Sequence, residues 1–341
     1  MRAIFADEKI AKQVMTAAKR ISKKRTSGDL STPRSNKRRR ESAQLIAPTP
    51  AGTEKALALP DPSTELEEIR KTSVKTNRAP LLLAFAVTLL KYTKPSQPIS
   101  SRLSLAQAVV SINSRSKAVS LGLQRGKAAD EDGWGEGHPK IRLMGRQIRV
   151  LKRWGYNPAD DVTRGEGLGE TKREDASGID GSASARIKAD LEDAPVQENA
   201  EPALWGLDLE ALRTANGLES GPSAVTDTGG LPIYNAQSAK AYLLRSFTSM
   251  PSALEADDQT PPTKKTHAET VVECEQNLAL LLGALDILYS SWSPHITGED
   301  LDSRAWQWYV HVRPDVQQGV AGWGGKGPVH LVKILDLQRH G

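Results

Sequence analysis

Eleven side chains between residues 102 and 154 have the chemistry needed to hold a polyanion. Arginine and lysine neutralise phosphate groups, and an indole can stack on an exposed base. Charge of this kind carries no sequence specificity, so we expect contacts with the backbone of DNA or RNA. A merely solvated cationic surface is the alternative. The candidate nucleic-acid-binding residues are Arg102, Arg115, Lys117, Arg125, Lys140, Arg142, Arg146, Arg149, Lys152, Arg153 and Trp154.

The acidic residues are unevenly distributed along the chain. Asp and Glu number 41 of 341 residues, yet the 61 residues from Ile69 to Ala129 contain none of them and carry eleven Lys or Arg. Residues 75–156 have a net charge of +11, whereas residues 159–201 have a net charge of −7. Because the basic stretch is also rich in Leu, Val and Ala, it predicts a folded unit with a polyanion as partner.

Other kinds of site find little support in the sequence. The single cysteine, Cys274, excludes an internal disulfide and a multi-cysteine zinc site, and the six histidines lack the i, i+4 spacing of a helical zinc site. Residues Gly319–Gly327 are rich in glycine but lack the phosphate-loop pattern. They predict either an anion-binding nest at Gly324 to Lys326 or a connector with Trp323 packed inward. We therefore predict no cofactor, no metal and no catalytic residue.

Two cationic clusters near the N-terminus have the spacing of a bipartite nuclear import signal. They follow an amphipathic helix predicted over residues 1–22, and they match two acidic grooves of an import receptor. A general phosphate-binding arm is compatible with the same charges. We predict nuclear localisation and an import receptor as partner. The import residues are Lys23, Lys24, Arg25, Lys37, Arg38, Arg39 and Arg40.

The elements expected to position the basic side chains lie in residues 71–156. Asn77 can cap a helix with Pro80 in its first turn, and a second helix is expected to end at Gly122. A β-hairpin that turns at Gly145-Arg146 follows. The sequence thus predicts a small basic α+β unit of two helices plus a β-hairpin.

The remaining segments predict linkers and a helical bundle. Residues 23–70 contain the import signal and a Pro-rich stretch that we interpret as disordered. Residues 157–202 predict an acidic disordered linker, or an internal mimic that competes with nucleic acid for the basic unit. Residues 203–341 predict a helical bundle with a flexible break near residues 250–267, in which Thr297 caps one helix. The expected fold class is mainly α, with disordered linkers between the parts.

Five segments resemble parts of uncharacterised predicted nuclear proteins of filamentous fungi. The resemblance implies that both folded parts belong to one protein, and it carries over no functional residue. The segments are TNRAPLLLAFAVTLLKYT (76–93), SRLSLAQAVVSINSRSKAVSLG (101–122), MGRQIRVLKRWGY (144–156), LWGLDLEALR (204–213) and AGWGGKG (321–327). The N-terminal helix also resembles the last helix of a helix-hairpin-helix module, and this likeness implies a role on DNA.

Three functions follow as hypotheses. The first is a non-enzymatic nuclear protein whose basic unit holds DNA or RNA and whose C-terminal bundle binds a protein partner. The second is a protein-interaction scaffold whose basic surface meets an acidic partner. The third is an enzyme acting on nucleic acid without a recognisable motif. The most apolar run is twelve residues, well short of the ~20 needed to cross a bilayer, so we predict no membrane partner.

Overall fold

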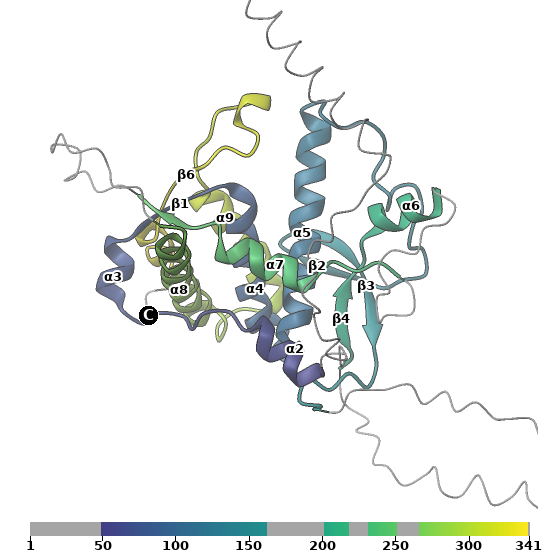
Figure 1. Ribbon diagram of the computed structural model, residues 1–341, viewed down its shortest axis with the longest axis horizontal. Coiled ribbons are helices and arrows are strands. Elements are labelled where there is room, and N and C mark those ends of the chain that lie inside the picture. The colour runs from purple at the N-terminus through teal and green to yellow at the C-terminus, as the bar shows by residue number, and fades with distance from the viewer. Residues whose placement is uncertain (1–48, 162–200, 218–230, 251–265, 340–341) are drawn as a thin grey trace, which may run out of the picture. The chain divides into compact units, whose positions relative to one another are not determined.

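A computed structural model describes residues 49–161, 201–217, 231–250 and 266–339. The predicted N-terminal helix and both import clusters lie outside these residues, as do most of the acidic segment and of the break near residues 250–267. The described residues are mainly helical, with two small antiparallel sheets (Figure 1). The helices are α2 (Pro50–Leu57), α3 (Leu66–Lys71), α4 (Arg78–Thr93), α5 (Ile99–Ser120), α6 (Leu209–Gly217), α7 (Ala236–Leu244), α8 (His267–Trp292), α9 (Gly298–Val312) and α10 (Val332–Leu335), with a short 3₁₀ turn η2 (Val320–Gly322).

Helix α4 forms the centre of the core. Its N-terminal cap is Asn77, whose side chain accepts a hydrogen bond from the Ala79 N–H at 3.1 Å, and Pro80 lies in the first turn, so the predicted start is confirmed. Every residue from Pro80 to Leu90 is buried. A helix that is apolar on all sides needs covering on all sides. In the structure α5, α8 and α9 all pack against it.

Each of the two sheets has three strands. The first has the order β5 (Thr248–Ser249), β1 (Ser73–Thr76) and β6 (Gly327–His330). The second has the order β2 (Lys140–Leu143), β3 (Arg146–Arg153) and β4 (Ala203–Gly206). All the pairs are antiparallel.

The structure does not separate a basic unit from a C-terminal bundle. Strand β1 lies in the predicted basic unit, but it pairs with β5 and β6 from the C-terminal region. One cluster of buried residues includes side chains of α4, α5, β3, α8 and α9. The physical reason is the all-round apolar surface of α4, because two helices and a hairpin alone would leave part of it exposed to water.

Three local predictions also differ from the structure. The expected linker of residues 23–70 includes α2 and α3, whose Leu57 and Ile69 are buried. The chain between them passes so close to α8 that a Cβ on Gly283 would lie 2.0 Å from the Ser63 carbonyl oxygen. Trp205 belongs to strand β4, beside the hairpin, rather than to a helical bundle. The hairpin turns at Met144 and Gly145, one residue earlier than predicted, because both adopt positive φ angles, of 50° and 69°.

Candidate anion-binding pocket

Within the described part of the chain, the predicted cations Arg115, Lys140, Arg142 and Arg149 are paired with carboxylates. Arg115 Nε lies 3.1 Å from Glu210 Oε1, Lys140 Nζ lies 3.0 Å from Asp130 Oδ2, and Arg142 Nε lies 3.4 Å from Asp302 Oδ2. Arg149 also bonds to Asp130 through its Nε. Asp130 lies in the loop after α5, and Glu210 and Asp302 lie in α6 and α9, so none of the three carboxylates comes from the acid-free stretch of residues 69–129. The four cations therefore hold elements of the fold together.

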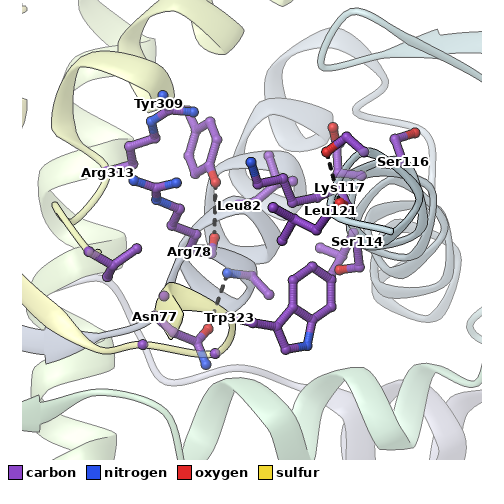
Figure 2. A pocket seen from close by; sticks show the side chains of 18 of the residues that line it. Asn77, Arg78, Leu82, Ser114, Ser116, Lys117, Leu121, Tyr309, Arg313 and Trp323 are labelled. Atoms are coloured by element: carbon purple, nitrogen blue, oxygen red, sulfur yellow. Dashed lines mark hydrogen bonds between the residues drawn. The ribbon is translucent and has the colours of Figure 1, made fainter. Parts of the chain in front are cut away.

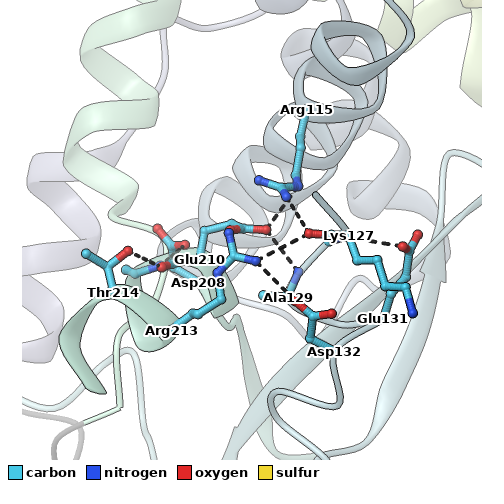
Figure 3. A network of polar contacts seen from close by, with 11 residues as sticks. Arg115, Lys127, Ala129, Glu131, Asp132, Asp208, Glu210, Arg213 and Thr214 are labelled. Carbon is cyan, nitrogen blue, oxygen red and sulfur yellow. Dashed lines mark hydrogen bonds and ion pairs between the residues drawn. The ribbon is translucent and has the colours of Figure 1, made fainter. Parts of the chain in front are cut away.

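Figure 3 shows how Glu210 connects three elements. Its Oε1 accepts a hydrogen bond from the Ala129 N–H at 3.0 Å and pairs with Arg115 of α5. Arg213, one turn further along α6, pairs with Glu210 and lies 3.3 Å from Asp132 Oδ2. The network fastens the loop of residues 121–139 between α5 and α6 (Figure 3).

The ion pairs that Asp130 makes with Arg149 and Lys140 shift the pKa of its carboxyl. Its partial burial by itself would raise the pKa of the carboxyl. Hydrogen bonds from Arg149 and Lys140, together with their positive charges, outweigh that effect and hold the pKa of Asp130 below its usual value. The carboxylate thus remains charged at neutral pH, and it stabilises the two cations beside it.

The other predicted residues have varied surroundings. Arg102 is half-buried near Glu54, and burial lowers the pKa of its guanidinium. Arg153 lies over the rings of Trp205 and Tyr156, with its Cζ 5.3 and 5.6 Å from the ring centroids. Arg125 and Lys152 are exposed, and the side chain of Trp154 is 70% exposed.

The last two predicted cations, Lys117 and Arg146, line a pocket of about 710 Å³. They meet there with Arg78 and Arg313, which are not among the residues predicted from the sequence. The walls are the first turn of α4, the C-terminal half of α5, the end of α9 and the glycine-rich loop of residues 314–326. Figure 2 shows Arg78 and Arg313 beside Tyr309 on one side, and Lys117 with Ser114 and Ser116 on the other.

No Asp or Glu lines this pocket. Within the described part of the chain, none of the four cations lies within 4.0 Å of a carboxylate oxygen. Two of the four walls come from the acid-free stretch of residues 69–129, and the glycine-rich loop contains a single acid, Asp315, which does not line the pocket. The positive potential inside is therefore not neutralised locally.

Neutral partners hold two of the pocket cations in place. The Nε of Arg78 donates a hydrogen bond to the Pro314 carbonyl at 3.2 Å. The Nε of Arg146 donates to Asn113 Oδ1 at 3.2 Å, and its Cζ lies 5.8 Å from the Trp306 ring centroid. These contacts orient the two guanidinium groups without cancelling their charge, and they leave N–H donors of each group for an anion.

The pocket floor is apolar and its rim is polar. Leu82, Val110 and Tyr309 are buried, whereas Lys117 and Gln317 are exposed. Burial raises the pKa of Tyr309 to about 12, although the charges of Arg313 and Arg78 act in the opposite direction. The tyrosine is therefore a neutral phenol, and its hydroxyl donates to the Arg78 carbonyl at 3.2 Å. The first turn of α4 adds the positive end of a helix dipole to this wall.

The glycine-rich loop contributes an aromatic side chain to the pocket. Trp323 lines it and is 46% exposed, so it is not packed inward as one of the two predicted alternatives required. Gly319 and Gly324, on either side of Trp323, have φ angles of 73° and 72°, a conformation that favours glycine. Figure 2 shows the indole between the Asn77 wall and the α5 wall.

The sequence also predicts no metal site and no membrane partner, and the structure bears on these two predictions only for the described residues. There, no group of three or more His, Cys, Asp or Glu side chains is arranged to hold a metal ion. No helix in the described ranges is long and apolar enough to span a bilayer. Comparison of the chain with protein-family models, with curated proteins and with solved structures finds no match.

Proposed function

We propose that this protein is a nuclear, non-enzymatic protein that binds the phosphate groups of DNA or RNA through Arg78, Lys117, Arg146 and Arg313. The observation that carries the proposal is the gathering of four cations in a pocket that no carboxylate lines. In an ordinary protein surface, acidic side chains are interspersed with basic ones. An acid-free group of cations matches a polyanion, which supplies the missing negative charge.

The arrangement favours phosphate over a diffuse contact with a cationic surface. Guanidinium groups offer several N–H donors in a fixed fork that fits phosphate oxygens. Arg78, Arg146 and Arg313 are partly buried beside an apolar floor, and charge pairing is stronger at partly buried positions than in open water. The predicted site on the hairpin is less suited to this role, because Arg142 and Arg149 already have carboxylate partners.

Nuclear import and a protein partner complete the proposal, and both rest on the sequence. The import signal consists of the clusters at residues 23–25 and 37–40. Replacement of Lys37 to Arg40 by Ala in a fluorescent fusion is expected to leave the fusion in the cytoplasm, and continued nuclear accumulation would refute the signal. The C-terminal helices remain the proposed contact for a protein partner.

Salt titration of binding tests the proposed phosphate contacts. A fluorescently labelled single strand of about 20 nucleotides is titrated with the full chain at several salt concentrations. Counterion release predicts a linear fall of log K with log salt, with a slope between about −0.7 for one neutralised phosphate and about −3 for four on a single strand. No affinity at about 50 mM salt would remove the proposal.

Two charge-matched variants locate the site. Lys117→Glu with Arg313→Glu is expected to weaken binding by more than about tenfold and to flatten the salt dependence. Arg125→Glu with Lys152→Glu makes the same change in net charge at exposed positions outside the pocket, and we expect it to weaken binding only slightly. Equal losses in the two variants would show that net charge, rather than the pocket, governs binding.

An acidic protein partner is the second candidate function, because the same four cations would also accept carboxylates. Competition separates the two. Polyglutamate and an unlabelled strand are compared as competitors at equal concentrations of negative charge. If polyglutamate displaces the labelled strand as well as the unlabelled strand does, the result favours a protein-interaction scaffold.

A further inference from the structure

The pocket is lined both by cations and by aromatic and apolar side chains, and a single nucleotide could contact both. Figure 2 shows Arg78 and Arg313 on one side, Leu121 beside Lys117 on the other, and Leu82 and Trp323 between the two sides. A polyanion held by charge alone would need no aromatic or apolar wall. A nucleotide has both an anionic phosphate and a flat, largely apolar base.

Trp323 is the most informative residue in this respect. Several other tryptophans pack against neighbouring rings, as Trp306 does with Tyr309 at 5.4 Å and Trp308 with Tyr289 at 5.9 Å, although Trp154, outside the pocket, does not pack on a ring of the described residues. In the described part of the chain, the Trp323 ring makes no such contact with an aromatic ring or a cation, and 46% of the residue is exposed. An indole at the edge of a cationic pocket is a platform on which a base can stack.

The size of the pocket sets a limit on what can enter. A volume of about 710 Å³ lies within the range of roughly 300–1,000 Å³ typical of small-molecule sites. A base in a duplex is stacked on both faces and its pairing edge is occupied, so it cannot reach a pocket wall unless it leaves the helix. An unpaired base has both faces available. Ser114 and Gln317 offer neutral hydrogen-bonding groups to its edge without selecting one base.

From these observations we infer that the pocket takes one unpaired nucleotide, with the phosphate at Arg78 and Arg313 and the base against Trp323. The inference rests on the proposed function and makes it more specific, because the protein then prefers single strands to duplexes. The same chemistry is found in a free mononucleotide and in a nucleotide within a strand, and the experiment below distinguishes these sources.

The test uses the full chain with two labelled probes, a single strand of about 20 thymidines and a blunt duplex of about 20 base pairs. We expect the single strand to bind about tenfold more tightly at equal salt, as the loss of one stacking contact would predict. Trp323→Ala is expected to weaken single-strand binding by about tenfold and to leave duplex binding within about twofold. Trp323→Phe retains a ring and is expected to keep most of the affinity.

Trp154→Ala is the matched control, because Trp154 is also an exposed tryptophan but does not line the pocket. It is expected to change neither affinity. Circular dichroism and the urea midpoint of each variant confirm that it is folded. Equal effects of Trp323→Ala and Trp154→Ala, or equal affinity for strand and duplex, would overturn the inference.

The outcomes also separate this inference from the proposed function. If strand and duplex bind equally and both depend on Lys117 and Arg313, the proposed function stands and the inference fails. If neither probe binds and adenosine monophosphate does not bind either, both fail. Competition with adenosine monophosphate shows whether the ligand is a free mononucleotide or a nucleotide within a strand. If the mononucleotide displaces the strand only weakly, a nucleotide within a strand is supported. Tight, Trp323-dependent binding of the mononucleotide without strand binding would support the pocket chemistry and overturn a nucleic-acid function.

Discussion

Two groups of cations in this protein come from the same elements and have opposite surroundings. Helix α5 provides Arg115, which pairs with Glu210, and two residues later Lys117, which lines the pocket. Strand β3 provides Arg146 to the pocket and Arg149 to Asp130. Residues two apart on a helix, or three apart on a strand, point to different sides. Neighbouring cations on one element can therefore have different roles.

The difference between the groups lies in which distant segments face them. The paired group faces the loop after α5 and the helices α6 and α9, which supply Asp130, Glu210 and Asp302. The pocket group faces the end of α9 and the glycine-rich loop, which supply Arg313 and Trp323 and no lining carboxylate. Cations with carboxylate partners stabilise the fold, whereas cations without them raise the local potential and are available to a ligand. Four experiments can break or sharpen this comparison.

The largest effect is expected from Asp302→Ala in the paired group. Asp302 is 5% exposed and accepts hydrogen bonds from the N–H groups of Met144 and Gly145, the turn of the hairpin. Its loss leaves two backbone donors without their partner and Arg142 without its carboxylate, although Arg142 still donates to Ser303 Oγ at 3.2 Å. We expect the free energy of unfolding to fall by about 3 kcal/mol. Urea denaturation measures this, with Asp315→Ala, an exposed acid, as control. Equal urea midpoints for the two variants would contradict a structural role for the paired group.

A smaller loss is expected from Arg149→Ala. Its side chain is 11% exposed, bonds to Asp130 and donates to the Gly135 carbonyl at 2.8 Å. Removal of this side chain should lower the free energy of unfolding by about 2 kcal/mol. Lys152→Ala, an exposed cation on the same strand, should change it by less than about 0.5 kcal/mol. If Arg149→Ala weakened nucleic-acid binding without any loss of stability, Arg149 would behave as a ligand-binding cation, and the division into two groups would be wrong.

The pH dependence of stability gives a third test. The pKa of Asp130 is lowered in the folded state, so its contribution is present at pH values above the ordinary carboxyl pKa of about 4. That contribution is lost as the pH falls through the lowered value. The difference in unfolding free energy between the wild-type chain and Asp130→Asn should therefore be largest near pH 6 and should narrow below about pH 4. A difference that stayed constant with pH would exclude the ion pair as its cause.

The local signals in the sequence are reliable for helix ends and poor for pairing partners. Asn77 with Pro80 begins α4, Thr297 caps α9 through the Asp300 N–H, and Gly122 has the positive φ expected after the end of α5. Each of these depends on neighbours within a few residues. The turn at Met144 escaped prediction because a non-glycine residue adopts a φ of 50° there.

The candidate site depends on contacts that no local pattern encodes. Arg78 and the Pro314 carbonyl are joined across 236 residues, and Arg142 and Asp302 across 160. The acid-free stretch was a useful signal, because it contains Arg78 and Lys117 and two of the pocket walls. It could not reveal that Asp130, Glu210 and Asp302 would neutralise four of the predicted cations while Arg313 and Trp323 would join two others.

The smallest effect on stability is expected in the pocket itself. Arg313 has no carboxylate partner in the described ranges and lies with three other cations. Arg313→Gln removes one source of like-charge repulsion and breaks no ion pair. We expect the free energy of unfolding to stay within about 0.5 kcal/mol or to rise slightly.

The same variant should respond differently to a polyanion. A ligand that binds only the folded chain raises its melting temperature by mass action. A short oligonucleotide should therefore raise the melting temperature of the wild-type chain by several degrees, and that of Arg313→Gln by clearly less. A scanning fluorimetry series with and without oligonucleotide measures both quantities in one experiment. If Arg313→Gln destabilised the chain as much as Arg149→Ala, the pocket cations would belong with the paired group. Replacement of a side chain that stabilises the fold lowers the free energy of unfolding, whereas replacement of one that is available to a ligand does not.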